Sequence, residues 1–203
     1  NFDDFPEFRS EFFIFMEKLT YSCFNMIMRL PPDEFDTFLE SIKFGTQHYQ
    51  IDVCEKSTYL LSKFLDLMRE RLQPDELKEF SQKYFVSLLL FSFKLLSNTS
   101  LKFAFSGHVN LIRSILLIPG ISVYAETIIQ QLYNEFPMKS PSELFELLQN
   151  LCQNISSPYQ FKEILKDFLI SVSHLLPHDP DLITKEKEEL TSRVEEAANG
   201  NTW

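Results

Sequence analysis

The sequence predicts an all-α protein, and three observations support this fold class. Apolar residues recur every three or four positions through most of the 203 residues, which is the spacing of a helix with a buried face. Short clusters of proline and acidic residues interrupt this spacing, and a new apolar stripe follows each of them. Glycine occurs only four times, and no segment alternates apolar and polar residues as a strand would.

Four of these clusters have the composition of a helix N-terminus. A proline at the first helical position loses no hydrogen bond, because the N–H group there has no partner within the helix. Acidic residues in the first turn interact favourably with the positive end of the helix dipole. Ser140 and Ser157 are predicted to cap the helices that start at the following prolines. The four segments are RLPPDEFDTFLESI (29–42), QPDELKEF (73–80), SPSELFEL (140–147) and SPYQFKEIL (157–165).

The first four helices are predicted from apolar positions that are three or four residues apart. The first covers residues 8–30 and stops at a Pro-Pro pair, and the second covers residues 33–49. The third, residues 51–73, ends before the next proline. The fourth, residues 75–97, is apolar on two faces, so neighbouring helices should cover it from two sides. One face consists of Phe80, Tyr84, Leu88, Phe91 and Leu95, and the other of Phe85, Leu89, Phe93 and Leu96.

Four further helices follow from the same spacing. The fifth covers residues 102–117, between the polar break NTS and the turn IPG. The sixth, residues 121–136, carries its apolar residues on one face up to a proline. The seventh covers residues 140–151 and has four leucines at helical spacing. The eighth, residues 159–172, ends where two further prolines stop the pattern.

These helices are predicted to form about four pairs over residues 1–178. Their first members begin near residues 7, 51, 102 and 140, and their second members begin at Asp33, Asp75, Ile121 and Tyr159. The resulting repeat of about 38–51 residues brackets the roughly 40–47 residues of HEAT and armadillo units. In such units each pair buries one face on the preceding pair and another on the next. The predicted architecture is therefore a HEAT-repeat α-solenoid of stacked antiparallel helix pairs, with a compact helical bundle as the alternative.

Residues 179–203 differ from the rest of the chain, and an acidic C-terminal helix with a short tail is predicted there. Between Asp179 and Glu196 there are seven acids and three bases, which give this stretch a net charge of −4. Its apolar stripe is thin, so the helix should be largely solvated. The stripe consists of Leu182, Ile183, Leu190 and Val194.

Charge and composition argue against binding of nucleic acid and against insertion into a membrane. The formal net charge is −10, and nucleic-acid binding depends on Lys and Arg that displace counterions, so direct binding of nucleic acid is not expected. Partners with basic patches are expected instead, unless the charge serves only solubility. The longest apolar stretch, residues 84–96, is too short to span a bilayer, so no membrane insertion is predicted.

Three cysteines without a C-x-x-C motif predict reduced thiols. There is no initiator methionine, and we expect the chain to be part of a longer polypeptide.

An enzyme is not predicted, and neither a cofactor nor a metal is expected. The four glycines are scattered, so there is no phosphate-binding loop, and neither G-x-S-x-G nor H-E-x-x-H occurs. His174 and His178 are four residues apart, but Pro177 interrupts the helical face that would bring them together. The phenylalanine-rich faces are at helical spacing and are expected to form the core rather than a ligand pocket.

No single segment is diagnostic of a family, but the order of six short segments along the chain is. They are DFPEFRSEFF (4–13), SCF (22–24), LPPDEFDTFLESI (30–42), QKYFVSLLLFSF (82–93), EFP (135–137) and FKEILKDFLISV (161–172). In this order, from about residue 2 to residue 196, the chain resembles the C-terminal region of nuclear export receptors of the importin-β/karyopherin family. The resemblance implies the last HEAT repeats of a ring-shaped receptor that has no catalytic activity.

The resemblance also implies a function and partners. Receptors of this kind carry cargo proteins with leucine-rich export signals out of the nucleus together with Ran-GTP. Ran-GTP, export-signal cargo and nucleoporins are therefore the implied partners, and shuttling between nucleus and cytoplasm is the implied localisation. The export-signal groove lies in earlier repeats, so this region is expected to act as scaffold, partial Ran contact and regulator of cargo binding. A generic HEAT-repeat interaction scaffold unrelated to transport is the alternative.

Finally, the resemblance implies which residues contact partners. The second helix of each pair lines the inner face in this fold, so Asp36, Glu40 and Lys43 are the candidate Ran-contacting residues, with ordinary solvent-facing charge as the alternative. The acidic segment corresponds to the helix that tunes groove opening and Ran affinity. Its candidate regulatory residues are Leu182, Ile183, Glu188, Glu189, Leu190 and Val194.

Overall fold

The computed structural model describes residues 6–119, 121–137 and 139–172, and all regular elements in these ranges are helices. The predicted all-α fold class is therefore confirmed for this part of the chain. The elements are α1 (Pro6–Ser22), α2 (Phe24–Ile27), α3 (Pro32–Thr46), α4 (Ile51–Arg71), α5 (Pro74–Ser97), the 3₁₀ helix η2 (Thr99–Ala104), α6 (Phe105–Leu116), α7 (Ile121–Glu135), α8 (Pro141–Gln153) and α9 (Pro158–Val172).

Prolines mark the helix starts as the sequence predicts. The helices α3, α5, α8 and α9 each begin at a proline. The predicted cap of α8 is present, because the Ser140 hydroxyl accepts a hydrogen bond from the Glu143 N–H at 3.3 Å. The Glu143 carboxylate accepts one from the Ser140 N–H at 2.7 Å. This reciprocal pair satisfies two N–H groups that the helix itself leaves without partners.

The first predicted helix is interrupted, and the interruption has a packing reason. α1 ends at Ser22 and the one-turn α2 begins at Phe24, although the sequence predicts one continuous helix. The break brings Phe24 into the core, where it is 2% exposed and its ring centroid lies 6.1 Å from that of Phe64. Met26, which belongs to the predicted apolar stripe, is 70% exposed. Burial of the larger aromatic ring therefore decides the local geometry here.

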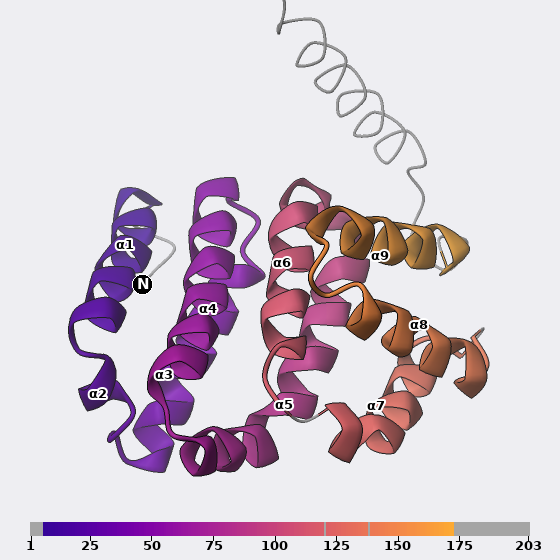
Figure 1. The fold of residues 1–203 in the computed structure, drawn as a ribbon. Helices are drawn as coiled ribbons and strands as arrows, with labels where there is room; N and C mark the ends of the chain where they lie inside the picture. The colour runs from indigo at the N-terminus through magenta and orange to yellow at the C-terminus, as the bar shows by residue number, and fades with distance from the viewer. Residues whose placement is uncertain (1–5, 120, 138, 173–203) are drawn as a thin grey trace, which may run out of the picture.

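The helices form a row that follows the order of the chain (Figure 1). α1, α4 and α6 stand side by side, joined by contacts between α1 and α4 and between α4 and α6. α3 packs against α4, and α5 packs against α6. At the other end of the row, α7 contacts α5 and α8, and α9 contacts α6 and α8. Each helix is thus held mainly by elements close to it in the sequence.

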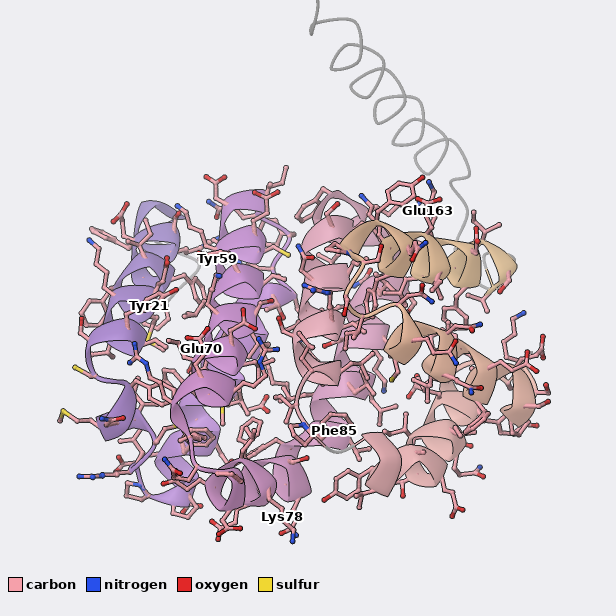
Figure 2. The ribbon with its side chains drawn as sticks, viewed as in Figure 1. Tyr21, Tyr59, Glu70, Lys78, Phe85 and Glu163 are labelled. Atoms are coloured by element: carbon pink, nitrogen blue, oxygen red, sulfur yellow. The ribbon has the colours of Figure 1, made fainter. Side chains whose placement is uncertain are left out.

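A continuous hydrophobic core runs along this row, from Phe13 in α1 to Val172 in α9. The prediction that α5 is covered on more than one face is confirmed, since Phe80 and Phe85 are only 5% and 1% exposed. Figure 2 shows side chains filling the space between neighbouring helices along the whole row. Full burial of one Leu or Phe side chain stabilises the fold by about 1.5–3 kcal/mol.

Among the described residues, no single helix is long and apolar enough to cross a membrane. α5 and the helical segment Thr99–Leu116 would together be long and apolar enough, by length and composition only. They are bent by 103° at the break between them.

Candidate interaction surface

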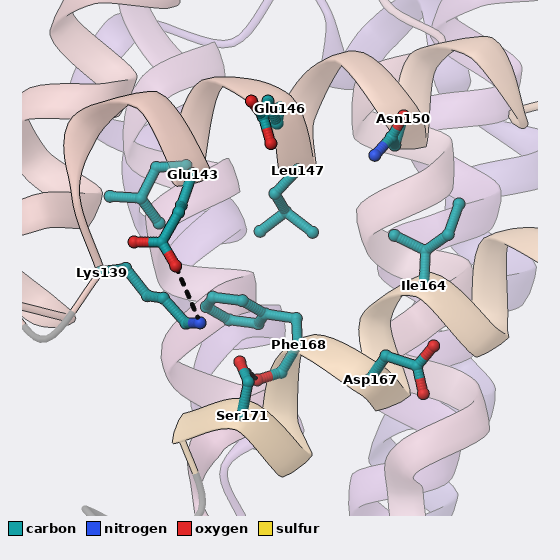
Figure 3. A pocket seen from close by; sticks show the side chains of 10 residues that line it. Lys139, Glu143, Glu146, Leu147, Asn150, Ile164, Asp167, Phe168 and Ser171 are labelled. Atoms are coloured by element: carbon teal, nitrogen blue, oxygen red, sulfur yellow. Dashed lines mark hydrogen bonds and ion pairs between the residues drawn. The ribbon is translucent and has the colours of Figure 1, made fainter.

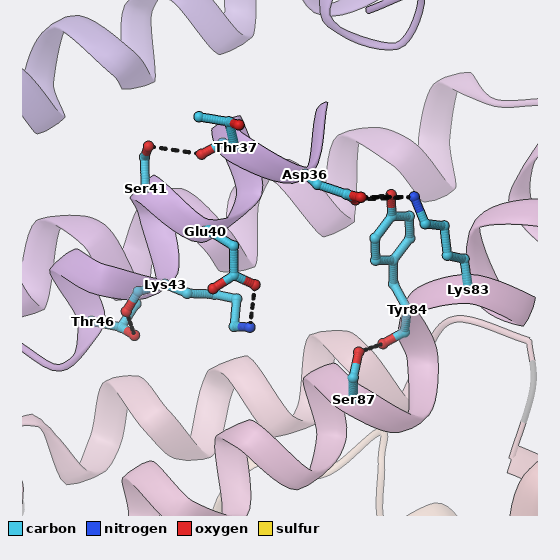
Figure 4. A network of polar contacts seen from close by, with 9 residues as sticks. All are labelled: Asp36, Thr37, Glu40, Ser41, Lys43, Thr46, Lys83, Tyr84 and Ser87. Carbon is cyan, nitrogen blue, oxygen red and sulfur yellow. Dashed lines mark hydrogen bonds and ion pairs between the residues drawn. The ribbon is translucent and has the colours of Figure 1, made fainter. Parts of the chain in front are cut away.

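A cluster of charged and aromatic side chains joins α3 to α5 and contains the first candidate residue. The Asp36 carboxylate accepts hydrogen bonds from the Lys83 Nζ at 3.0 and 3.1 Å and from the Tyr84 hydroxyl (Figure 4). The Lys83 ammonium also lies 4.8 Å from the centroid of the Tyr84 ring. The side chains of Asp36 and Lys83 remain 43% and 49% exposed, so a partner protein can reach both.

The other two candidate residues form a second pair one turn further along α3. The Lys43 Nζ is bonded to a Glu40 carboxylate oxygen and lies 4.8 Å from the centroid of the Phe91 ring on α5. Lys43 is covered by this contact and is only 17% exposed, whereas Glu40 is 65% exposed. The structure therefore places all three predicted residues on α3 and divides them between two adjacent clusters (Figure 4).

Sequence reasoning missed Lys83 and Tyr84 as members of this surface. The helical spacing assigns Tyr84 to an apolar face, and its ring does pack against the core, with its centroid 5.6 Å from that of Phe35. The signal that could have found the pair is the polar tip of a tyrosine next to a lysine on a helix with two apolar faces.

Local electrostatics keep this cluster charged at neutral pH. Two hydrogen bonds hold the pKa of Asp36 below its ordinary value. The larger effect comes from the Tyr84 hydroxyl and the smaller from Lys83. Hydrogen bonding to Tyr84 and Asp36 raises the pKa of Lys83. Burial raises the pKa of Tyr84 most, and the hydrogen bond to Asp36 raises it further. The hydroxyl therefore stays protonated and can donate. Because exposed ion pairs contribute only about 0–1 kcal/mol, this cluster adds little to the stability of the fold.

A groove of about 610 Å³ lies beside these residues, between α1 and α3. Its floor is aromatic, and its wall on α3 carries the hydroxyl groups of Thr37 and Ser41 as well as the carboxylates of Asp36 and Glu40. The aromatic residues are Phe12, Phe13 and Phe44.

Two smaller grooves lie further along the row. One of about 420 Å³ lies between α4 and the η2–α6 segment, and its lining includes Tyr59 and Phe103. The other, of about 250 Å³, lies between α8 and α9 and has Leu147, Ile164 and Phe168 among its lining side chains (Figure 3). At its edge the Lys139 Nζ is bonded to Glu143 at 3.3 Å.

A buried cysteine and histidine lie near each other but are not arranged for catalysis. The Cys54 Sγ donates to the Thr46 carbonyl oxygen at 3.1 Å and lies 3.9 Å from the His108 Nε2. Burial raises the pKa of Cys54 to about 11 and lowers the pKa of His108 to about 4. Both groups are therefore neutral at physiological pH, whereas a nucleophilic cysteine needs a lowered pKa.

Some predicted residues lie outside the described ranges. They are the histidines His174 and His178 and the candidate regulatory residues Leu182, Ile183, Glu188, Glu189, Leu190 and Val194. Within the part of the chain that the structure describes, no three His, Cys, Asp or Glu side chains are grouped so that they could hold a metal ion.

Comparison with known proteins decides the family. The family model described as "CRM1 C terminal" matches residues 1–175. The chain belongs to the CRM1 C-terminal family. Curated relatives of the CRM1 family are similar over nearly the whole chain: Exportin-1 of Drosophila melanogaster is 24% identical over 98% of it, and Protein EXPORTIN 1A of Arabidopsis thaliana is 23% identical over 92%. Exportin-1 of Schizosaccharomyces pombe is 23% identical over 93%.

These matches confirm the resemblance found in the sequence. The CRM1 family is a family of nuclear export proteins and not of enzymes, so the prediction that the chain is not an enzyme is confirmed. The chain spans about one fifth of the length of these curated relatives, with 20% of the fly protein and 19% of the plant and yeast proteins covered.

Proposed function

We propose that this chain is the C-terminal region of a nuclear export receptor, which carries proteins with leucine-rich signals out of the nucleus together with Ran-GTP. The observation that carries the proposal is the family match over residues 1–175, together with the similarity to exportin-1 proteins of animal, plant and yeast. Cargo, Ran-GTP and nucleoporins are the proposed partners, and the complete protein shuttles between nucleus and cytoplasm. A generic helical scaffold is the alternative.

The proposed architecture is a HEAT-repeat α-solenoid over residues 1–178, with the successive pairs α1/α3, α4/α5, α6/α7 and α8/α9, in which α3 and α5 pack against the first helix of the next pair. Two features support it. The second members of the pairs begin within one residue of the predicted positions. The first members α1, α4 and α6 contact one another in sequence order, as expected when each pair packs against the next.

The proposed Ran contact is the α3–α5 surface formed by Asp36, Glu40, Lys43 and Lys83. Its charges are of both signs; those of Asp36, Glu40 and Lys83 are exposed, and the two lysines are held next to aromatic rings. Such an arrangement favours selective binding of a surface with complementary charge. Residues 179–203 are proposed to form an acidic C-terminal helix and tail that regulate the affinity for cargo and for Ran.

The test uses the full-length protein with fluorescent export-signal peptide and with Ran loaded with GTP or GDP. We expect the peptide and Ran-GTP to bind cooperatively, and Ran-GDP to have no such effect. The triple variant Asp36→Asn, Glu40→Gln, Lys43→Gln should weaken Ran-GTP binding about tenfold, or about 1.4 kcal/mol. The matched control Glu146→Gln, Lys162→Gln, Asp167→Asn changes exposed or part-exposed charges on α8 and α9 and should have little effect.

The outcomes separate the parts of the proposal. Binding that does not depend on GTP would contradict the export function and favour the generic scaffold. Cooperative binding that the triple variant leaves unchanged would contradict only the assigned Ran contact.

Truncation after His178 should change the affinity for the export-signal peptide and leave the helices folded. An unchanged affinity would contradict the proposed regulation.

A further inference from the structure

The groove of about 250 Å³ between α8 and α9 has an apolar floor and an acidic rim. Leu147 and Phe168 on its floor are 8% and 7% exposed, and Ile164 beside them is partly exposed. Figure 3 shows Glu146 of α8 and Asp167 of α9 on opposite sides of this apolar strip. The groove can therefore receive an apolar side chain of a partner and place a carboxylate on either side of it.

The two acids of this rim are not neutralised by neighbouring bases. The lysine at the edge of the groove, Lys139, is paired with Glu143, and α8 itself contains no basic residue. Both Glu146 and Asp167 are exposed, and within the described ranges neither belongs to an ion pair. A cationic side chain of a partner can thus pair with either acid without displacing a lysine of this part of the chain.

The acids on α3 differ in this respect. Asp36 is paired with Lys83, and Glu40 is paired with Lys43. An external cation gains less at such a pair, because it has to compete with the lysine that is already bound. The α8–α9 groove combines unpaired acids with an apolar strip, and this combination favours a basic, partly apolar ligand.

Charge also argues against two occupants from the same kind of polypeptide. Residues 179–196 carry a net charge of −4, so the acidic rim repels this segment. A second copy of the chain brings a formal net charge of −10, which opposes self-association at an acidic face. A basic partner, in contrast, is attracted by the rim and by the acidic segment, which begins at Asp179, shortly after the end of α9.

We propose that the α8–α9 groove binds a basic amphipathic helix of a partner protein. An apolar residue of this helix enters between Leu147 and Phe168, and its Lys or Arg side chains pair with Glu146 and Asp167. A stripe of apolar residues flanked by bases is complementary to an apolar strip flanked by acids. Because the ion pairs are exposed, the binding is expected to be salt-dependent. The site is separate from the α3–α5 surface and requires neither Ran nor cargo.

The experiment measures binding of a fluorescent peptide to the full-length protein by anisotropy. The probe is a peptide of about 15–20 residues that forms a helix with a leucine stripe flanked by lysines. We expect the double variant Glu146→Gln, Asp167→Asn to weaken binding about tenfold at low salt. The matched control Glu70→Gln, Glu79→Gln removes the same charge from exposed positions on α4 and α5 and should leave the affinity nearly unchanged.

A second variant and a second peptide test the apolar contact. Ile164→Ser makes the groove more polar and should weaken binding about threefold to tenfold. A shuffled peptide of the same composition keeps the charge but loses the leucine stripe, and should bind at least about tenfold more weakly. Circular dichroism verifies that each variant is folded, and the double variant decides if Ile164→Ser is not.

Three results would overturn the proposal. The first is binding that the double variant leaves unchanged. The second is equal binding of the shuffled peptide, which would show only a general attraction of bases to an acidic protein. The third is binding that is lost on truncation after His178 but not in the groove variants, because residues 179–203 would then be the binding site. The assay contains neither Ran nor cargo, so its failure is distinguishable from failure of the export function.

Discussion

At the scale of single residues, buried small and polar groups determine how closely the helices approach. Gly45 on α3 has no side chain, and a Cβ atom there would collide with the Ser57 hydroxyl of α4 and with the Phe13 ring of α1. At the next residue, the Thr46 carbonyl accepts a hydrogen bond from Cys54, and His108 of α6 lies against that thiol. One short stretch of α3 therefore fixes the distances to three helices.

The buried histidine makes stability depend on pH in a defined direction. Because burial lowers the pKa of folded His108 from 6.5 to about 4, the unfolded chain binds a proton in this range that the folded chain does not. The stabilising effect of His108 is thus complete above about pH 6.5 and is lost as the pH falls toward 4, by about 1.4 kcal/mol per pH unit. Cys54, with its pKa near 11, stays neutral throughout.

Urea unfolding between pH 7 and pH 4.5 measures this effect. The variant His108→Gln should have a shallower decrease in the free energy of unfolding than the wild type over this range, because glutamine does not titrate. Comparison of the two proteins cancels the contribution of the carboxylates. Parallel curves would show that His108 titrates normally in the folded state.

At the scale of elements, local sequence sets most helix boundaries, because prolines and caps act within one turn. Ser140 and Glu143 exchange hydrogen bonds at the start of α8, and the bond from the Ser140 N–H is the largest cause of the lowered pKa of Glu143. The corresponding bond at α5 runs from the Gln73 N–H to Glu76 at 2.9 Å. These helix starts are therefore encoded by a few adjacent residues.

Removal of the α8 cap should have a modest and local cost. We expect Ser140→Ala to destabilise the chain by about 1 kcal/mol, which corresponds to a decrease of about 2–4 °C in Tm for a protein of this size. Scanning calorimetry of the 203-residue chain measures it. The control is Ser140→Thr, which keeps a capping hydroxyl and should change Tm by less than half as much. Equal effects of the two substitutions would contradict the capping role.

At the scale of the whole molecule, the row of helices has mostly neighbour-to-neighbour contacts, so a disturbance should remain local. A part-buried long-range bond joins the fourth pair to the third: the Arg113 Nε on α6 donates to the Ile155 carbonyl oxygen at 2.6 Å. This bond is partly buried and has a charged donor, which makes it stronger than an exposed neutral bond.

The variant Arg113→Leu tests this locality. It leaves the Ile155 carbonyl without its donor, and we expect a loss of about 1–3 kcal/mol, seen as faster hydrogen exchange in α8 and α9 and unchanged exchange in α1 and α3. Lys162→Met is the control, because the Lys162 Nζ also joins the two pairs, through an exposed bond of 2.8 Å to Ser106. Acceleration in every helix alike would show that the row unfolds as one unit.

The sequence by itself determined the helical class, the proline-marked helix starts and the family. These depend on spacings and caps within one or two turns, or on the order of segments, and both can be read along a single chain. The position of the charged candidates on α3 followed from the same spacing, since Asp36, Glu40 and Lys43 are separated by four and three residues.

Only the tertiary structure decided which apolar stripes are covered and which charges meet. Burial of Phe24 in place of Met26, the exposure of Phe15, and the bond from Tyr84 to Asp36 all depend on helices that are distant in sequence; Tyr84 and Asp36, for example, are 48 residues apart. The physical reason is that burial is a property of the neighbour that a face meets. A helix with two apolar faces carries no local signal that tells which of them its own chain will cover.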